Sequence, residues 1–380
     1  MHLGVKIPIL GRKMKIFFCL VCMVNIFFVI LHVIFLQDMA RIQDKDRVYD
    51  FFHPFVDWMF RHSYRHFQYV GKENIPTDGA VIFAPNHTNA LCDAMCILGI
   101  DRQHKVFVAR ADIFKNPSQA KFLHFLKIMP IHRMRDGLDE VRKNDETLNT
   151  AVDVLDDNVP FCILPEGTHR PKHSLLPLNK GIFHIALRAN ERFGDKKPVY
   201  IVPVGLEYGD YFHLWDSLTV NIGHPINVTQ EIKRLQAQSS TELTQPQLIN
   251  ALRDELTQRM REQILWVPDD EHYEENIHLL QENPPAPFDK FKKHRIPHWL
   301  LLIALVLLFP LFLVCAVVTL PIWLIWLIIR RKIKDPAFHN SVQYVWQLIC
   351  LPLLLFIQAP FWIFVQEYLY QLRKLKNEKH

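Results

Sequence analysis

Three long apolar runs lie near the two ends of the chain, and shorter apolar runs lie in its middle. The long runs cover residues 16–36, 300–329 and 345–365. At about 1.5 Å per helical residue, each is long enough to cross the ~30 Å hydrocarbon layer of a bilayer. The pattern therefore predicts membrane attachment at both ends and a folded domain between them.

The first run follows Arg12, Lys13 and Lys15, as in a signal sequence, but no small-residue cleavage site comes after it. We interpret this run as an uncleaved anchor. A second interpretation stays open, in which Met39 is the true start and the upstream stretch is an artefact of the gene model.

The run at 300–329 contains Pro310 and Pro321 and is longer than one upright helix needs. A tilted, kinked helix and a re-entrant hairpin both fit this length. Basic clusters flank every C-terminal run, which favours hairpins that return to the cytoplasm. We expect an integral membrane protein with the lipid bilayer as a partner and with its central domain facing the cytoplasm.

The central residues 50–230 alternate short apolar runs with helical stretches. Four runs predict buried strands, at 81–84, 106–109, 161–164 and 199–202, and three stretches predict helices, at 138–157, 182–192 and 246–265. Strands that are apolar throughout and alternate with helices indicate an α/β domain with both sheet faces covered. We divide the chain into an anchor (1–38), a central domain (39–230), a helical extension with a linker (231–296) and C-terminal membrane segments (297–380).

Composition narrows this picture only slightly. The net charge of +5 over 380 residues suits an anionic membrane surface or anionic substrates, and we expect no nucleic-acid partner. Cys19 and Cys22 form a CxxC inside an apolar run with no second pair, so we expect buried thiols rather than a zinc or redox site.

A first chemical cluster, residues 86–93, follows the predicted strand at 81–84. His87 and Asp93 can form a general-base pair, in which the carboxylate holds one imidazole nitrogen protonated and leaves the other free to take a hydroxyl proton. With 20 histidines in the chain, this pair alone is a weak signal.

A second cluster follows the predicted strand at 161–164 and contains Glu166, Gly167, Thr168 and Arg170. Alone it reads as a turn with glycine at a special backbone position. Backbone N–H groups at such a turn, together with an arginine, can also hold a phosphate. Lys172 and Lys180 add positive charge nearby. Two further clusters, at 129–133 and 201–206, could each alone be explained as residues that end a strand.

In this order and spacing, the four clusters together resemble the four blocks of the phospholipid/glycerol acyltransferase family, over about residues 60–230. Residues 165–170 resemble its phosphate-binding block and residues 86–93 its catalytic block. One departure is that five residues separate His87 from Asp93, where the usual block has four. The longer form resembles a glycerol-3-phosphate acyltransferase-like branch.

The resemblance implies a glycerolipid acyltransferase-type sheet covered by helices, and direct acyl transfer without an acyl-enzyme. His87, oriented by Asp93, would deprotonate the acceptor hydroxyl, which attacks the thioester of acyl-CoA or acyl carrier protein. No metal or cofactor is implied. The residues that would place the phosphorylated, glycerol-type acceptor are Arg133, Glu166, Gly167, Thr168 and Arg170, with Lys180 as a further phosphate contact.

Several alternatives remain open at this point. We favour glycerol-3-phosphate or a close relative as acceptor, with a lysophospholipid such as lysophosphatidic acid as the alternative. A protein of another class, a non-catalytic lipid-binding membrane protein, would not need the His87, Asp93 and Glu166 constellation. A thioester hydrolase would admit water in place of the acceptor. The aromatic stretch at 49–60 predicts either an interfacial helix or a helix packed on the domain core.

Overall fold

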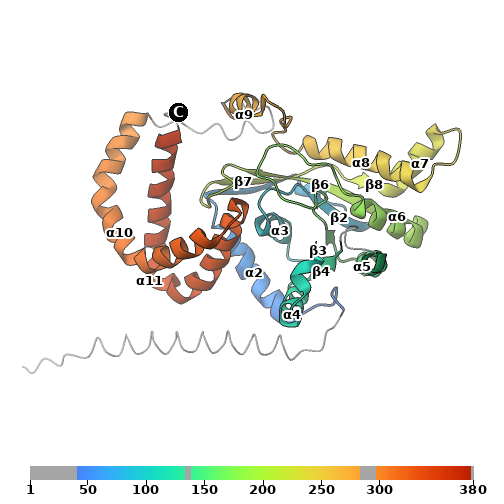
Figure 1. The fold of residues 1–380 in the computed structure, drawn as a ribbon, viewed down its shortest axis with the longest axis horizontal. Coiled ribbons are helices and arrows are strands. Elements are labelled where there is room, and N and C mark those ends of the chain that lie inside the picture. Colours follow the sequence, from blue (N-terminus) through green and yellow to red (C-terminus); the bar gives the residue numbers. More distant parts are fainter. Residues whose placement is uncertain (1–40, 133–137, 283–296, 378–380) are drawn as a thin grey trace, which may run out of the picture.

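A mixed sheet forms the centre of the computed structural model, which describes residues 41–132, 138–282 and 297–377. The strand order is β1-β7-β6-β2-β5-β3-β4, with β8 beside β6 (Figure 1). The strands are β1 (His66–Val70), β2 (Ala80–Pro85), β3 (Val106–Arg110), β4 (Ile128–Ile131), β5 (Phe161–Cys162), β6 (Val199–Tyr208), β7 (Ser217–Ile222) and β8 (Ile226–Asn227). The predicted N-terminal anchor and Arg133 lie outside the described residues.

Strands β6, β2, β5, β3 and β4 run parallel, whereas β7 and β8 are antiparallel to β6. Strand β2 lies between β6 and β5, with Ile82 opposite both Ile201 and Phe161. The carboxyl ends of parallel strands meet at one edge of a sheet, which is where ligand-binding loops gather in such folds. The parallel half therefore brings the segments after β2, β5 and β4 to a common edge.

Helices cover both faces of this sheet. Helices α2 (Arg47–Arg61) and α3 (Leu91–Leu98) pack on one face with Val81 and Phe83, whereas α5 (Leu138–Asp156), α6 (Gly181–Phe193) and α8 (Gln245–Arg261) pack on the other with Ile82. Alternate residues of β2 thus enter two different cores, which explains why this strand is apolar throughout. The remaining helices of the domain are α4 (Pro117–Phe125), α7 (Val228–Gln238) and α9 (Tyr273–Glu282).

The four predicted strands and three predicted helices are confirmed, with shifted bounds. The strand predicted at 199–202 continues to Tyr208, and the helix predicted at 246–265 ends at Arg261. Strands β1, β4, β7 and β8 were not predicted, and the antiparallel pairs beside β6 are an addition to the expected α/β sheet. Helix α8, assigned from sequence to an extension, packs its buried side against the sheet core.

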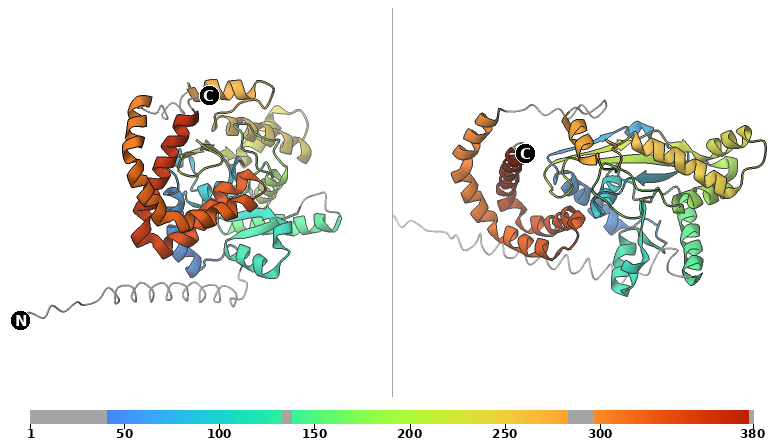
Figure 2. Two further views of the ribbon diagram at one scale, coloured as in Figure 1. Left: turned by 60° about the vertical axis from the view of Figure 1, so that its left-hand side comes forward. Right: turned by 45° about the horizontal axis from the view of Figure 1, so that its top comes forward.

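The C-terminal residues form two long helices, α10 (His298–Lys332) and α11 (His339–Asn377), joined through a short 3-10 helix, η6 (Pro336–Phe338). Both helices bend and lie side by side next to the domain (Figures 1 and 2). Proline interrupts the hydrogen bonding of a helix, and Pro310 and Pro321 lie inside α10. Residues 300–329 therefore form one continuous bent helix rather than a re-entrant hairpin.

Helix α11 returns to the domain near both of its ends. Near its start, Tyr344 is buried in the same core as α2 and α3, and its hydroxyl donates to the Val56 carbonyl at 2.8 Å. Near its end, Glu367 accepts hydrogen bonds from Arg65 at 2.9 Å and from Trp215 at 3.0 Å. The domain and the C-terminal helices consequently form one connected structure.

Candidate active site

The segments after β2 and β5 meet at the carboxyl edge of the sheet, and β4 ends at the same edge. Residues 86–93 and 164–170 are brought together there, as the backbone N–H of Arg170 donating to the His87 carbonyl at 3.0 Å demonstrates. Strand β4 ends at Ile131, opposite Arg110 of β3. Two of the four sequence clusters therefore touch directly, and the described part of the third, 129–131, ends β4 at the same edge.

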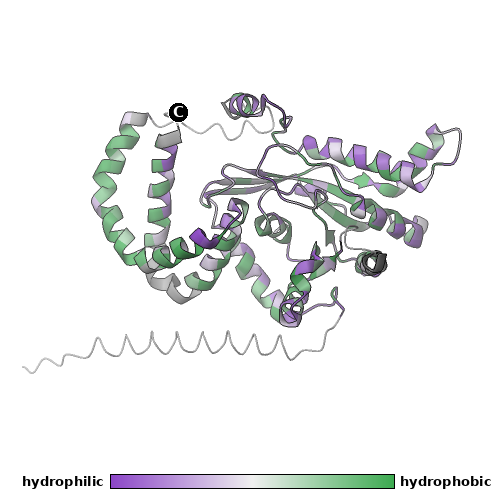
Figure 3. Ribbon diagram, viewed as in Figure 1, coloured by the Kyte–Doolittle hydropathy of each residue, from purple (hydrophilic) through white to green (hydrophobic). Residues whose placement is uncertain are grey.

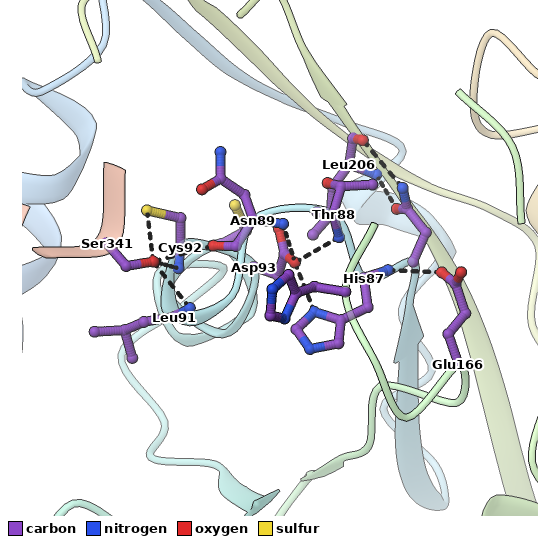
Figure 4. A network of polar contacts seen from close by, with 12 residues as sticks. His87, Thr88, Asn89, Leu91, Cys92, Asp93, Glu166, Leu206 and Ser341 are labelled. Carbon is purple, nitrogen blue, oxygen red and sulfur yellow. Dashed lines mark hydrogen bonds and ion pairs between the residues drawn. The ribbon is translucent and has the colours of Figure 1, made fainter. Parts of the chain in front are cut away.

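His87 and Asp93 form a hydrogen-bonded pair at this edge (Figure 4). The imidazole Nδ1 lies 2.8 Å from Oδ2 of Asp93, which assigns the proton to Nδ1 because an ionised carboxylate only accepts. Among the contacts of the described residues, none reaches Nε2 of His87, whose side chain is 17 % exposed. The pair thus presents one unprotonated nitrogen toward solvent, the arrangement that a general base requires.

Asp93 is fully buried and accepts hydrogen bonds through both of its oxygens. Oδ2 also accepts from the backbone N–H groups of Thr88 and Asn89, at 2.8 and 2.7 Å, and Oδ1 accepts from the hydroxyl of Tyr208 at 2.7 Å. Burial raises the pKa of Tyr208 well above its ordinary value, so this phenol acts as a donor. The carboxylate is therefore held in one orientation before any substrate arrives.

The extra residue between His87 and Asp93 is accommodated by the turn that precedes α3. Ala90, the residue before the helix, has φ 48° and ψ −117°, a conformation that glycine adopts far more readily than alanine. A residue other than glycine in such a backbone conformation destabilises the fold by on the order of 1–3 kcal/mol. The longer spacing is thus compatible with a close His87–Asp93 contact, at the expense of a strained turn.

Glu166 joins the two clusters through backbone hydrogen bonds. Oε1 accepts from the N–H of His87 at 2.7 Å, and Oε2 accepts from the N–H of Leu176 at 2.8 Å. Burial raises the pKa of this carboxyl to about 7, although both backbone bonds act in the opposite direction. Both oxygens accept from backbone N–H groups, so Glu166 orients this backbone turn.

The turn after β5 depends on glycine at position 167. Gly167 has φ +68°, and a Cβ placed there would lie 2.5 Å from Nδ2 of Asn179. The same amide nitrogen donates to the carbonyls of Pro165 and Glu166, at 3.1 and 3.0 Å. A side chain at 167 would displace Asn179 and open this turn. Gly167 and Thr168 are exposed at its outer surface.

Two cations beside this turn share one carboxylate. Arg170 and Lys172 both contact Asp269, the latter at 2.5 Å, and a second guanidinium nitrogen of Arg170 donates to Ser174 at 2.7 Å. The hydrogen bond from Lys172 lowers the pKa of Asp269 below its ordinary value, so this carboxylate is ionised. An anionic ligand would compete with it for both cations. Lys180 is exposed at the start of α6 and lies apart from these contacts.

Residues near the α10–α11 junction cover one side of the site. His169 lies against His87, with 5.6 Å between ring centroids, and its Nε2 contacts Asp335 at 2.8 Å. The ring of Phe338 packs edge-on against His169, with 4.9 Å between centroids. The connection between α10 and α11 therefore contributes directly to the wall around the proposed base.

Sequence reasoning missed several residues that shape this site. Asn86 extends β2 toward β6, since it exchanges side-chain hydrogen bonds with the backbone of Leu206 at 2.6 and 3.3 Å. Its place beside His87 was a usable signal. The others, Tyr208, Asp269 and residues of α11, lie far away along the chain, and no local pattern marks them. The fourth cluster, around Val202 and Val204, is buried inside β6.

A family model described as Acyltransferase matches residues 66–207, which include β1 to β6 and both clusters of the site. A chloroplastic 1-acyl-sn-glycerol-3-phosphate acyltransferase of Brassica napus is 25 % identical over 206 residues, covering 53 % of this chain and 55 % of that protein. The 1-acyl-sn-glycerol-3-phosphate acyltransferase alpha of Ovis aries is 26 % identical over 143 residues, covering 37 % and 45 %. The chain thus spans about half the length of these curated relatives.

Among solved structures, the chain is similar to the 1-acyl-sn-glycerophosphate acyltransferase PlsC of Thermotoga maritima. The match has 19 % identity and a TM-score of 0.41, and it covers 66 % of this chain and 95 % of that one.

Proposed function

We propose that the chain is a glycerolipid acyltransferase, which transfers a fatty acyl group from a thioester to the free hydroxyl of a 1-acylglycerol-3-phosphate. The observation that carries this proposal is the His87–Asp93 pair, at 2.8 Å, beside a glycine turn that bears Arg170. This geometry supports a general base and an anion-binding turn at the same sheet edge.

His87 performs the proton transfers of the reaction. Nε2 takes the proton of the acceptor hydroxyl while the oxygen forms the new C–O bond with the thioester carbonyl carbon. The C–S bond then breaks, and the imidazolium returns its proton to the leaving thiolate. Asp93 holds Nδ1 protonated throughout and stabilises the imidazolium by its charge.

The acceptor phosphate binds at the turn after β5 in this proposal. Arg170 is joined to His87 through its backbone N–H, which donates to the His87 carbonyl, and Lys172 follows it in the chain. Gly167 and Thr168 are exposed in this turn, and the exposed Lys180 supplies further positive charge. Arg133 stays a proposed acceptor contact on sequence grounds. Glu166 acts indirectly, by holding the backbone of His87.

Acyl transfer in isolated membranes tests this function. Labelled acyl-CoA is offered with 1-acylglycerol-3-phosphate or with glycerol-3-phosphate, to the wild type, to His87→Ala and to His272→Ala, an exposed histidine outside the site. We expect His87-dependent product with 1-acylglycerol-3-phosphate, the acceptor for which the curated relatives are named. If product forms only with glycerol-3-phosphate, the acceptor is the one favoured by the sequence analysis. Equal product from wild type and His87→Ala would end the case for this catalytic base.

We also propose that the α10–α11 pair attaches the enzyme to the membrane without crossing it. Within the described residues, one helix carries an apolar segment of spanning length, Trp299–Leu320 in α10, and only 17 % of it is buried (Figure 3). Helix α11 contacts the domain near both ends, through Tyr344 and Glu367. A helix held to one soluble domain at both ends enters and leaves the bilayer on the same side.

Exposed aromatic side chains on α2 extend this apolar surface. Phe51 is 76 % exposed and Trp58 is 45 % exposed, whereas Met59 and Phe60 of the same helix are buried. One side of the helix packs on the core, as one interpretation expected, and the exposed aromatic side chains support an additional interfacial role. The catalytic domain would face the cytoplasm in this arrangement.

Site-directed labelling tests the topology. Cysteines are introduced at Lys334, which is exposed in the α10–α11 connection, and at Lys374, near the end of α11. A membrane-impermeant maleimide should label both cysteines only after the membrane is permeabilised and the reagent reaches the cytoplasmic side. Labelling from opposite sides would make α11 a spanning helix and reject the proposed attachment, while leaving the acyl-transfer assay unaffected.

A further inference from the structure

Helix α3, which carries Asp93, begins without a local cap. The residue before it is Ala90, whose side chain cannot bond the free N–H groups of the first turn. Ala90 is also at positive φ, so the turn that feeds the helix is strained. Such a helix start needs stabilisation from elsewhere in the protein.

Ser341 of α11 supplies the missing cap. Its hydroxyl oxygen lies 3.1 Å from the N–H of Leu91 and 3.4 Å from that of Cys92, and it donates to the Asn89 carbonyl at 3.1 Å (Figure 4). The Cys92 N–H also donates to the Asn89 carbonyl at 3.0 Å, so the bond from Leu91 is the one that depends on Ser341. Ser341 is 3 % exposed, so water does not replace these bonds.

Asn340, the residue before Ser341, is linked to the same turn through the carbonyl of Tyr211. Asn340 is fully buried, and its amide donates to the carbonyl of Tyr211 at 3.0 Å. The amide of Asn89 donates to that same carbonyl at 3.1 Å. Asn340 of α11 and Asn89 of the catalytic turn therefore converge on one carbonyl in the segment after β6. The first turn of α11 is thereby fixed relative to the turn between His87 and α3.

We infer that Ser341 is a positioning residue for the catalytic pair, an inference that rests on the proposed function. Asp93 lies in the first turn of α3, and its Oδ2 binds both the turn and His87. Fraying at Leu91 and Cys92 would move the carboxylate relative to the imidazole. The cap therefore maintains the 2.8 Å contact across the longer His87–Asp93 spacing.

The inference makes the C-terminal helices part of the catalytic structure. Ser341 lies about 250 positions after Leu91 in the sequence, and among the described contacts it is the group that accepts from the Leu91 N–H. The catalytic turn is complete only when α11 is docked. Because α11 is also the proposed membrane-bound helix, the arrangement of the base depends on the helix pair that binds the bilayer.

The test compares Ser341→Ala with Tyr344→Phe in the full chain. Each substitution removes one hydroxyl from the same side of α11, but Tyr344 bonds the Val56 carbonyl of α2 and not the catalytic turn. For Ser341→Ala we expect kcat to fall about 10-fold with KM for acyl-CoA nearly unchanged, because loss of a helix cap displaces the first turn. Tyr344→Phe should keep kcat within about 2-fold at a similar loss of Tm.

Amide hydrogen exchange of residues 88–93 provides a readout that needs no turnover. We expect exchange there to be about 10-fold faster in Ser341→Ala and unchanged in Tyr344→Phe. Unchanged exchange in Ser341→Ala, or equal loss of kcat in the two variants, would overturn the inference. If the wild type transferred no acyl group to any acceptor, the proposed function would fail, whereas faster exchange would still establish Ser341 as the cap.

Discussion

The phenolic oxygen of Tyr208 lies 2.7 Å from Oδ1 of Asp93, on the carboxylate oxygen that His87 does not use. Asp93 is thereby held from β6 on one side and from its own turn on the other. A carboxylate fixed in this way keeps the imidazole in one tautomer and one orientation.

Tyr208→Phe removes the donor to Oδ1 and leaves that oxygen buried without this partner. We expect kcat to fall about 10-fold and stability to fall by about 1–3 kcal/mol, the usual cost of an unpaired buried polar group. Steady-state kinetics and thermal unfolding check both values. Tyr64→Phe is the matched control, since Tyr64 is a buried neighbour with ring centroids 6.2 Å apart, and its hydroxyl is not bonded to Asp93. Equal effects of the two substitutions would contradict this role.

Asp93→Asn should keep the fold and lose most of the activity. The amide oxygen can still accept from Thr88 and Asn89, but the side chain no longer carries the charge that stabilises a protonated His87. We expect kcat to fall about 10²- to 10⁴-fold, the range seen when a base loses its orienting carboxylate. Kinetics with a saturating acceptor and a thermal unfolding curve measure this. A variant with wild-type kcat would remove Asp93 from the mechanism.

The raised pKa of Glu166 predicts a stability change with pH. Its pKa is about 7 in the folded protein and near 4.5 in an unfolded chain, so between these values only the folded state keeps the proton. Stability is therefore lost as the pH rises through this window, by about 3 kcal/mol for a shift of this size.

Glu166→Gln should remove that part of the pH dependence, although it also costs a backbone hydrogen bond at every pH. The measurement is Tm between pH 4.5 and pH 8 for the wild type, for Glu166→Gln and for Glu242→Gln, an exposed control. The gap between the first two curves should change with pH. A constant gap would show that Glu166 does not titrate in this range.

If the acceptor phosphate binds Arg170 and Lys172 as proposed, Asp269 competes with it for both cations. Asp269→Asn should free both cations and lower KM for the phosphorylated acceptor several-fold, the scale expected for two partly exposed ion pairs. We expect kcat to change little. Asp270→Asn, which removes the same charge one residue along the chain, is the control. A raised KM in Asp269→Asn would mean that Asp269 instead orients Arg170 for binding.

The sequence was most informative where chemistry and structure are local. The run at 81–84 reads as a strand because its alternate residues enter two cores, whereas β7 contains Thr219 and Asn221 and β1 lies at the sheet edge. His87 and Asp93 are six positions apart, so a turn and one helix start bring them together.

Long-range partners carry no such signal. Tyr208 reaches Asp93 because β6 lies next to β2, and Ser341 reaches α3 because a helix from the far end of the chain packs there. Neither relationship follows from spacing or hydrophobic period. The role of Glu166 is a similar case. Its place in the sequence block at 165–170 suggests contact with the substrate, whereas in the structure both carboxylate oxygens accept hydrogen bonds from backbone N–H groups.

The docking of α11 has a practical consequence for preparing this enzyme in water. Truncating the chain before α10 would remove the apolar helices α10 and α11. It would also expose the surface of α2 and α3 against which Tyr344 packs. A shortened protein of that kind should therefore precipitate or lose its organised site. Replacing the outward-facing leucines and valines of α10 with polar residues, while leaving the inner side of α11 intact, is the better route to a detergent-free sample.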